Sequence, residues 1–146
     1  MGDSATAVSV IVPARNARGT VGVCVRALLE QVSAGLDVEL IVVDDNSPDR
    51  TWEFAEELTD RFPVRVIRRA GKLGLGAAVM EGFALSMRPY LGVIDADLSH
   101  DPAILPELIH GLREHDLMIG SRFGVTSQVE KWAFPVSYTH LPLPTS

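Results

Sequence analysis

Short apolar runs alternate along the chain with stretches in which apolar residues recur every three or four positions. The runs at 8–13, 38–43, 64–67, 90–94 and 117–119 are rich in β-branched residues and bounded by turn formers, which predicts buried strands. The stretches at 20–32, 52–62, 78–88 and 102–114 have the spacing of one helix face. Strands alternating with helices predict an α/β fold with a mostly parallel sheet flanked by helices.

Acidic residues follow two of the predicted strands. Asp44 and Asp45 come at the end of the second strand, and Asp95 and Asp97 come at the end of the fourth. In open parallel sheets, ligands bind outside the carboxyl ends of the strands. The sequence therefore predicts a ligand site at this edge of the sheet.

Composition limits the classes of function that fit. The 146 residues, 47% of them hydrophobic, suffice for one domain with a core. With 13 Lys and Arg against 19 Asp and Glu, the net charge of −6 argues against a nucleic-acid binder, which needs clustered cations. A single cysteine, Cys24, excludes a disulfide framework or a cysteine-rich zinc site. No run reaches the roughly 20 apolar residues of a membrane span, so we expect a soluble, cytoplasmic protein.

The last residues differ from the rest. Residues 136–146 carry no charge, contain two closely spaced prolines and have no strand or helix period. Their start, VSYTHL, resembles one reading frame of a transposon-end sequencing adapter. We expect 1–135 to be an incomplete, C-terminally truncated domain and 136–146 to be a non-native or disordered tail. The reading frame of the source DNA beyond Pro135 tests this hypothesis.

The sequence Asp95-Ala96-Asp97 is the strongest candidate for chemistry. Residues two apart on a strand point to the same side, so both carboxylates could face one site. Two close carboxylates repel each other unless a cation lies between them, and Mg²⁺ or Mn²⁺ prefers such oxygen ligands. The alternative is capping of the helix that begins at Pro102, a role that fits Asp101 best.

Other candidates have two interpretations. A carboxylate of Asp44 or Asp45 could bind a base or ribose, but Asp-Asn-Ser-Pro is also typical of a turn. The glycine-rich segment 68–76 could bind phosphate or form a tight turn with a solvated lysine. The spacing of the histidines indicates no metal site, and Cys24 fits a small core residue.

Five motifs occur in the order found in family 2 glycosyltransferases. They are VIVPARN at 10–16, IVVDDNSPD at 41–49, GKLGLG at 71–76, DADLSH at 95–100 and GSRF at 120–123. The resemblance covers about residues 7–134 and is closest to the dolichyl/polyprenyl-phosphate mannose synthases. It implies the GT-A fold, a Rossmann-like α/β sandwich that uses a nucleotide sugar and a divalent metal. Residues 1–135 would then be the nucleotide-sugar-binding part.

The resemblance also implies roles for individual residues. Asp97 and Arg122 would be catalytic, with Arg122 reaching the diphosphate or the acceptor phosphate and Lys72 lying near phosphate. The other implied contacts are Pro13 and Arg15 with the nucleotide, Val43 and Asp45 with the base and ribose, Asp95, Ala96 and Asp97 with the sugar nucleotide and the metal, and Ser99 with the metal. The first motif departs from the family, which has an aromatic residue at Arg15 and an acid at Ala17.

The implied reaction moves mannose from GDP-mannose to a polyprenyl or dolichyl phosphate, with Mg²⁺ or Mn²⁺ and with inversion at the anomeric carbon. We expect no nucleic-acid partner, and membrane contact only through a missing C-terminal part at the cytoplasmic face. Two alternatives remain open: a UDP-sugar-dependent polyprenyl-phosphate glycosyltransferase and a phosphoacceptor receiver domain. A receiver needs a lysine at the end of the last strand, where Gly120-Ser121-Arg122 stands instead.

Overall fold

A computed structural model of the protein describes residues 7–32, 36–71 and 73–121. Four parallel strands form one sheet in the order β3-β2-β1-β4. The strands are β1 (Ala7–Ala14), β2 (Asp37–Asp44), β3 (Val64–Arg68) and β4 (Tyr90–Val93). The helices are α1 (Val21–Val32), α2 (Thr51–Leu58), α3 (Leu75–Ala84), the short 3₁₀ helix η1 (Pro102–Ile104) and α4 (Leu105–Gly111).

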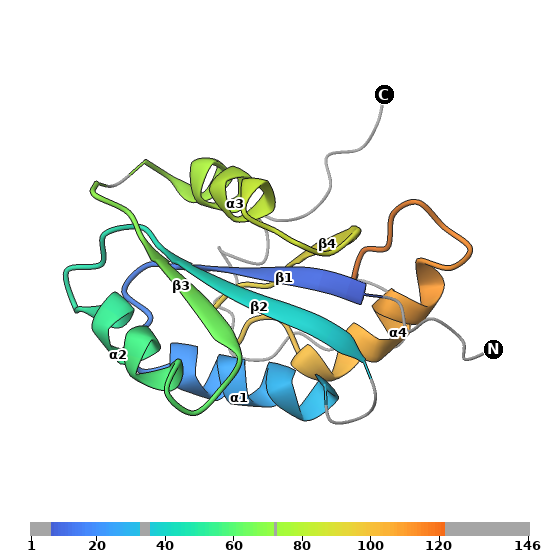
Figure 1. Ribbon diagram of the computed structural model, residues 1–146, viewed down its shortest axis with the longest axis horizontal. Coiled ribbons are helices and arrows are strands. Elements are labelled where there is room, and N and C mark those ends of the chain that lie inside the picture. The colour runs from blue at the N-terminus through green and yellow to red at the C-terminus, as the bar shows by residue number, and fades with distance from the viewer. Residues whose placement is uncertain (1–6, 33–35, 72, 122–146) are drawn as a thin grey trace.

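Helices cover both faces of the sheet, as the sequence predicts for an α/β fold. Figure 1 shows α1, α2 and α4 below the sheet and α3 alone above it. Successive side chains of β1 point to opposite faces of the sheet. Val10 and Val12 join the large core between the sheet and α1, while Ile11 packs in the smaller core between the sheet and α3. The predicted parallel α/β architecture is confirmed.

One predicted strand does not form. Residues 117–119 have no strand conformation, and Leu117 and Ile119 are exposed by 72% and 74%. A strand requires a neighbour for its backbone hydrogen bonds. Within the described residues no neighbouring strand pairs with this run, so its apolar character does not suffice to make it a strand.

The helix predicted for 102–114 is shorter than expected and begins differently. Asp101 is its cap, because its Oδ1 accepts a hydrogen bond from the N–H of Ala103 at 2.9 Å. The first turn is η1, and α4 ends at Gly111 rather than at residue 114. None of the helices in the described ranges could cross a membrane, since even α1 has only 12 residues.

Candidate active site

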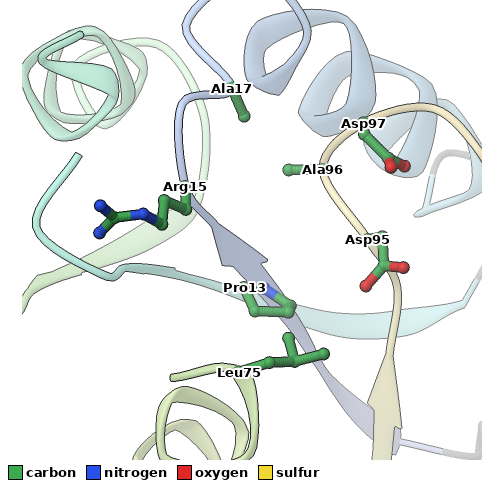
Figure 2. A pocket seen from close by; sticks show the side chains of 7 residues that line it. All are labelled: Pro13, Arg15, Ala17, Leu75, Asp95, Ala96 and Asp97. Atoms are coloured by element: carbon green, nitrogen blue, oxygen red, sulfur yellow. The ribbon is translucent and has the colours of Figure 1, made fainter. Parts of the chain in front are cut away.

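A pocket of about 220 Å³ opens at the carboxyl ends of β1 and β4. In the strand order β3-β2-β1-β4, β2 lies on one side of β1 and β4 on the other. The pocket therefore lies at the topological switch point of the sheet, where open α/β sheets bind ligands. Typical ligand pockets hold roughly 300–1,000 Å³, so this one is smaller than most. The lining residues are Pro13, Arg15, Ala17, Leu75, Asp95, Ala96 and Asp97 (Figure 2).

The carboxylates of Asp95 and Asp97 lie on one wall of this pocket. Figure 2 shows both on the loop that follows β4, with Ala96 between them and Arg15 on the opposite side, pointing away. The side chain of Asp95 is 38% exposed, and Asp97 is exposed as well. Both carboxylates are therefore accessible to a ligand in the pocket.

Asp97 is held in its ionised form. Partial burial alone would raise the pKa of its carboxyl, but hydrogen bonds from the hydroxyl and the N–H of Ser99, together with His100, lower that pKa below its usual value. The N–H of Ser99 lies 2.9 Å from Oδ1 of Asp97. Ser99 thus lies beside Asp97, and its contact with a metal, which the resemblance implies, stays a prediction.

These residues fit a divalent cation that prefers hard oxygen ligands. Asp95 and Asp97 supply two accessible carboxylates, with the Ser99 hydroxyl next to Asp97. In the part of the chain that the structure describes, no group of three or more His, Cys, Asp or Glu side chains could hold a metal ion. Mg²⁺ commonly takes only one or two carboxylates and leaves its other positions to water and substrate phosphates.

The loop after β1 forms a second wall and is fixed by the segment that follows β2. Three consecutive N–H groups of this loop donate to side-chain oxygens: Asn16 to Ser47 Oγ (3.1 Å), Ala17 to Thr51 Oγ1 (2.9 Å) and Arg18 to Asp49 Oδ2 (3.1 Å). Asp44 in turn accepts bonds from the N–H and the hydroxyl of Ser47. For Asp44, the turn interpretation is therefore the one the structure supports.

Asp45 lies next to the pocket wall but not on it. Asp45 is only 5% exposed. Its carboxylate accepts hydrogen bonds from Nη1 of Arg69 at 2.9 Å and from the N–H groups of Leu73 at 3.0 Å and Gly74 at 3.1 Å. The guanidinium of Arg15 reaches the backbone oxygen of Asp45 at 2.8 Å. The carboxylate thus secures the loop before α3, and a contact with base or ribose stays a prediction.

Not all the residues named from the sequence meet at the pocket. The structure brings together Pro13, Arg15, Asp95, Ala96 and Asp97. The side chain of Val43 is fully buried in the core under α3, away from the pocket walls. Arg122, Lys72 and the segment 136–146 lie outside the described residues.

Two residues that the sequence did not mark as functional contact Asp95. The Nδ1 atom of His100 accepts a hydrogen bond from the N–H of Asp95 at 3.2 Å, and Sγ of Cys24 lies 3.7 Å from its backbone oxygen. Burial and the nearby charges of Asp97 and Asp95 raise the pKa of Cys24 to about 11, so the thiol keeps its proton. The signal in the sequence was that His100 is the last residue of the motif DADLSH, although no role was given to it.

Comparison with known proteins identifies the family. Residues 9–144 match the model of a protein family that is described as "Glycosyl transferase family 2". The chain belongs to glycosyl transferase family 2. Membership of this family excludes the receiver-domain alternative, and it agrees with the GT-A fold of the sheet and its flanking helices.

Family 2 relatives match most of this chain. This chain is 43% identical over 128 residues to a dolichol-phosphate mannosyltransferase of Pyrococcus furiosus. The alignment covers 87% of this chain and 36% of the relative. This chain is also 35% identical over 130 residues to a dolichol-phosphate mannosyltransferase of Saccharomyces cerevisiae, covering 84% and 47%. The chain thus spans less than half the length of either relative.

A solved structure with the same fold is a mannosyltransferase of Pyrobaculum calidifontis in complex with GDP-Man and Mn²⁺. The TM-score is 0.57 at 22% identity, and the match covers 62% of this chain and 27% of that one. At this identity the likeness supports the fold alone.

Proposed function

We propose that this chain is the nucleotide-sugar-binding part of a transferase that moves mannose from GDP-mannose to a dolichyl or polyprenyl phosphate. The observation that carries the proposal is the carboxylate pair Asp95 and Asp97 on the wall of a pocket at the strand ends. The identity of 43% to a dolichol-phosphate mannosyltransferase supports the sugar and the acceptor.

Asp95 and Asp97, with the hydroxyl of Ser99, would hold Mg²⁺ or Mn²⁺. When bound, such an ion neutralises the charge that develops on a nucleoside diphosphate as it leaves. The N-terminus of α3 begins at Leu75 on the same pocket, and its partial positive charge favours a diphosphate there. Arg122 is proposed to meet the diphosphate or the acceptor phosphate.

The acceptor phosphate is already an anion, so its attack on the anomeric carbon requires no general base. Direct displacement of the diphosphate by this oxygen inverts the configuration at that carbon. The residues that line the pocket accordingly have to bind, orient and ionise correctly rather than move a proton. Asp97, whose pKa is lowered, fits this demand at neutral pH.

The test is ligand-dependent thermal stability of this chain. We expect the melting temperature to rise with GDP and Mn²⁺ together, because a ligand that binds only the folded state stabilises it. The variant Asp97→Asn should lose this response, whereas Asp60→Asn, a change at an exposed aspartate after α2, should keep it. Absence of any response to nucleoside diphosphates in the wild type would contradict the proposal.

A response to UDP in place of GDP would keep the transferase class and change the donor. Arg15 and Ala17, which depart from the family pattern, both line the pocket, so this alternative has a physical basis. Transfer itself is measured with a full-length transferase that contains this segment, as label moved from GDP-[¹⁴C]mannose to dolichyl phosphate. There we expect Asp97→Ala to reduce the rate by at least about 100-fold, since even the outer-shell partners of metal ligands cost 10–100-fold.

A further inference from the structure

The backbone of Asp95 is held by side chains rather than by the sheet. The N–H of the preceding residue, Ile94, still donates to the backbone oxygen of Ile11 at 3.0 Å. One residue later, the N–H of Asp95 donates to Nδ1 of His100 at 3.2 Å, and Sγ of Cys24 lies 3.7 Å from its backbone oxygen. Both backbone polar groups of Asp95 therefore have side-chain partners just after the end of β4.

The same imidazole also faces the carboxylate of Asp95. Nδ1 accepts the hydrogen bond from the N–H of Asp95, and Nε2 on the same ring faces the carboxylate of Asp95. This Nε2 lies 3.7 Å from Oδ2 of Asp95, which is too long for a hydrogen bond. His100 is thus bonded to the backbone of Asp95 and lies beside its carboxylate.

The turn between these residues carries backbone strain that brings His100 back to Asp95. Leu98 has a φ of 65°, a left-handed conformation that is unfavourable for a residue other than glycine. The hydrogen bond from the Ser99 N–H to Asp97 closes the turn on one side, and the bond from Asp95 to His100 closes it on the other. A strained turn that is held by two such bonds is typical of a functional site.

We propose that His100 is a positioning residue for the carboxylate pair of Asp95 and Asp97. Through Nδ1 it fixes the backbone of Asp95, whose oxygen lies beside the thiol of Cys24, so that both carboxylates face one cation and its diphosphate ligand. The inference rests on the proposed function. It goes beyond the proposed function because it gives a role to His100, which is not among the residues that line the pocket.

The two ring nitrogens can be replaced one at a time. The side-chain oxygen of asparagine stands at about the distance of Nδ1 from the backbone, and the amide of glutamine at about the distance of Nε2. His100→Asn therefore keeps an acceptor for the N–H of Asp95, His100→Gln keeps a group at Nε2, and His100→Ala keeps neither. The ring is 36% exposed, so these variants leave no large cavity in the core.

The experiment measures Mn²⁺ binding in the presence of GDP, from the loss of the free-Mn²⁺ signal in electron paramagnetic resonance. We expect His100→Ala and His100→Gln to raise the apparent Kd by about 10–100-fold, as loss of an outer-shell partner does, and His100→Asn to stay near the wild type. The matched control is His115→Ala, a change at an exposed histidine, which should have no effect. Melting temperatures without ligand should be similar for all four variants.

If the wild type binds Mn²⁺ with a nucleoside diphosphate, two results would overturn the inference. Unchanged Mn²⁺ binding by His100→Ala would show that the bond to Asp95 does not matter for the site. Rescue by His100→Gln but not by His100→Asn would make His100 a direct ligand through Nε2. If the wild type binds Mn²⁺ with neither GDP nor UDP, the proposed function fails and the inference fails with it, whereas a wild type that binds isolates the role of His100.

Discussion

Asp45 and Asp97 are two aspartates that follow parallel strands, but their carboxylates have different surroundings. Asp45 is almost completely buried and accepts three hydrogen bonds, from Arg69, Leu73 and Gly74. Asp97 is exposed on the pocket and is bonded by the neighbouring Ser99. One carboxylate is used within the protein to secure a loop, and the other is left accessible to a ligand.

The acid stability of the protein should depend on Asp45. Burial alone would raise its pKa, but the N–H groups of Leu73 and Gly74 and the guanidinium groups of Arg69 and Arg15 lower it overall. A carboxyl with a lowered pKa in the folded state contributes stability that is complete above its unfolded-state pKa of about 3.9. That contribution is lost as the pH falls through the lowered value.

We therefore expect the free energy of unfolding to decline on acidification less steeply in Asp45→Asn than in the wild type. Urea denaturation between pH 7 and pH 2.5 measures this slope, and Asp60→Asn should leave it unchanged. Arg69→Ala should cost about 3–5 kcal/mol at pH 7, because it removes the direct ion-pair partner of the buried Asp45 carboxylate. Equal slopes in the wild type and Asp45→Asn would contradict this role of Asp45.

Among the elements, α3 is the one that approaches the sheet most closely through a glycine. A Cβ added at Gly82 would lie 2.6 Å from Cγ2 of Ile11, which is completely buried in β1. The same helix contains Gly76, where an added Cβ would meet nothing within 4 Å. Only the first of these two glycines is required by packing.

The pair predicts opposite effects of the same substitution. We expect Gly82→Ala to destabilise the fold by about 1–3 kcal/mol, because the stiff, buried Ile11 cannot move away at low cost. Gly76→Ala should be neutral or stabilising by up to about 1 kcal/mol, from the better helix propensity of alanine. Both are read from urea midpoints, and similar losses in the two variants would argue against close packing at Gly82.

The elements also show what could be predicted from the sequence. Strands and helices up to residue 111 follow from local periods of apolar residues, and the carboxyl-end rule placed Asp95 and Asp97 at the pocket. The strand at 117–119 was wrong because pairing depends on a neighbour elsewhere in the chain. The roles of His100 and Arg69 were missed because they bind a backbone N–H and a buried carboxylate, which leave no spacing pattern.

On the scale of the whole molecule, the two edges of the sheet differ in chemistry. The β3 edge carries Arg65 and Arg68, and the guanidinium of Arg68 lies 3.7 Å from the centre of the Trp52 ring. The β4 edge is uncharged, with Leu91 and Val93 each 44% exposed. Charged side chains at an edge discourage pairing with another chain, so β4 is the edge more prone to self-association.

A charge on β4 should therefore reduce self-association. We expect Leu91→Lys to shift the onset of association to several-fold higher protein concentration, measured by light scattering or sedimentation velocity. The matched control is Met80→Lys on α3, which adds the same charge at a 65% exposed position away from the strand edge. An equal effect of both variants would assign the association to general hydrophobicity rather than to the edge.

The strand order also has a consequence for synthesis on the ribosome. Because β4 is the neighbour of β1 on the side away from β2, the first strand gains its second neighbour only after residue 93 has emerged. At a synthesis rate of roughly 5–20 residues per second, the nascent chain passes several seconds with the apolar β1 as an open edge. The ligand pocket, which needs both β1 and the loop after β4, is completed in the same step that closes this edge.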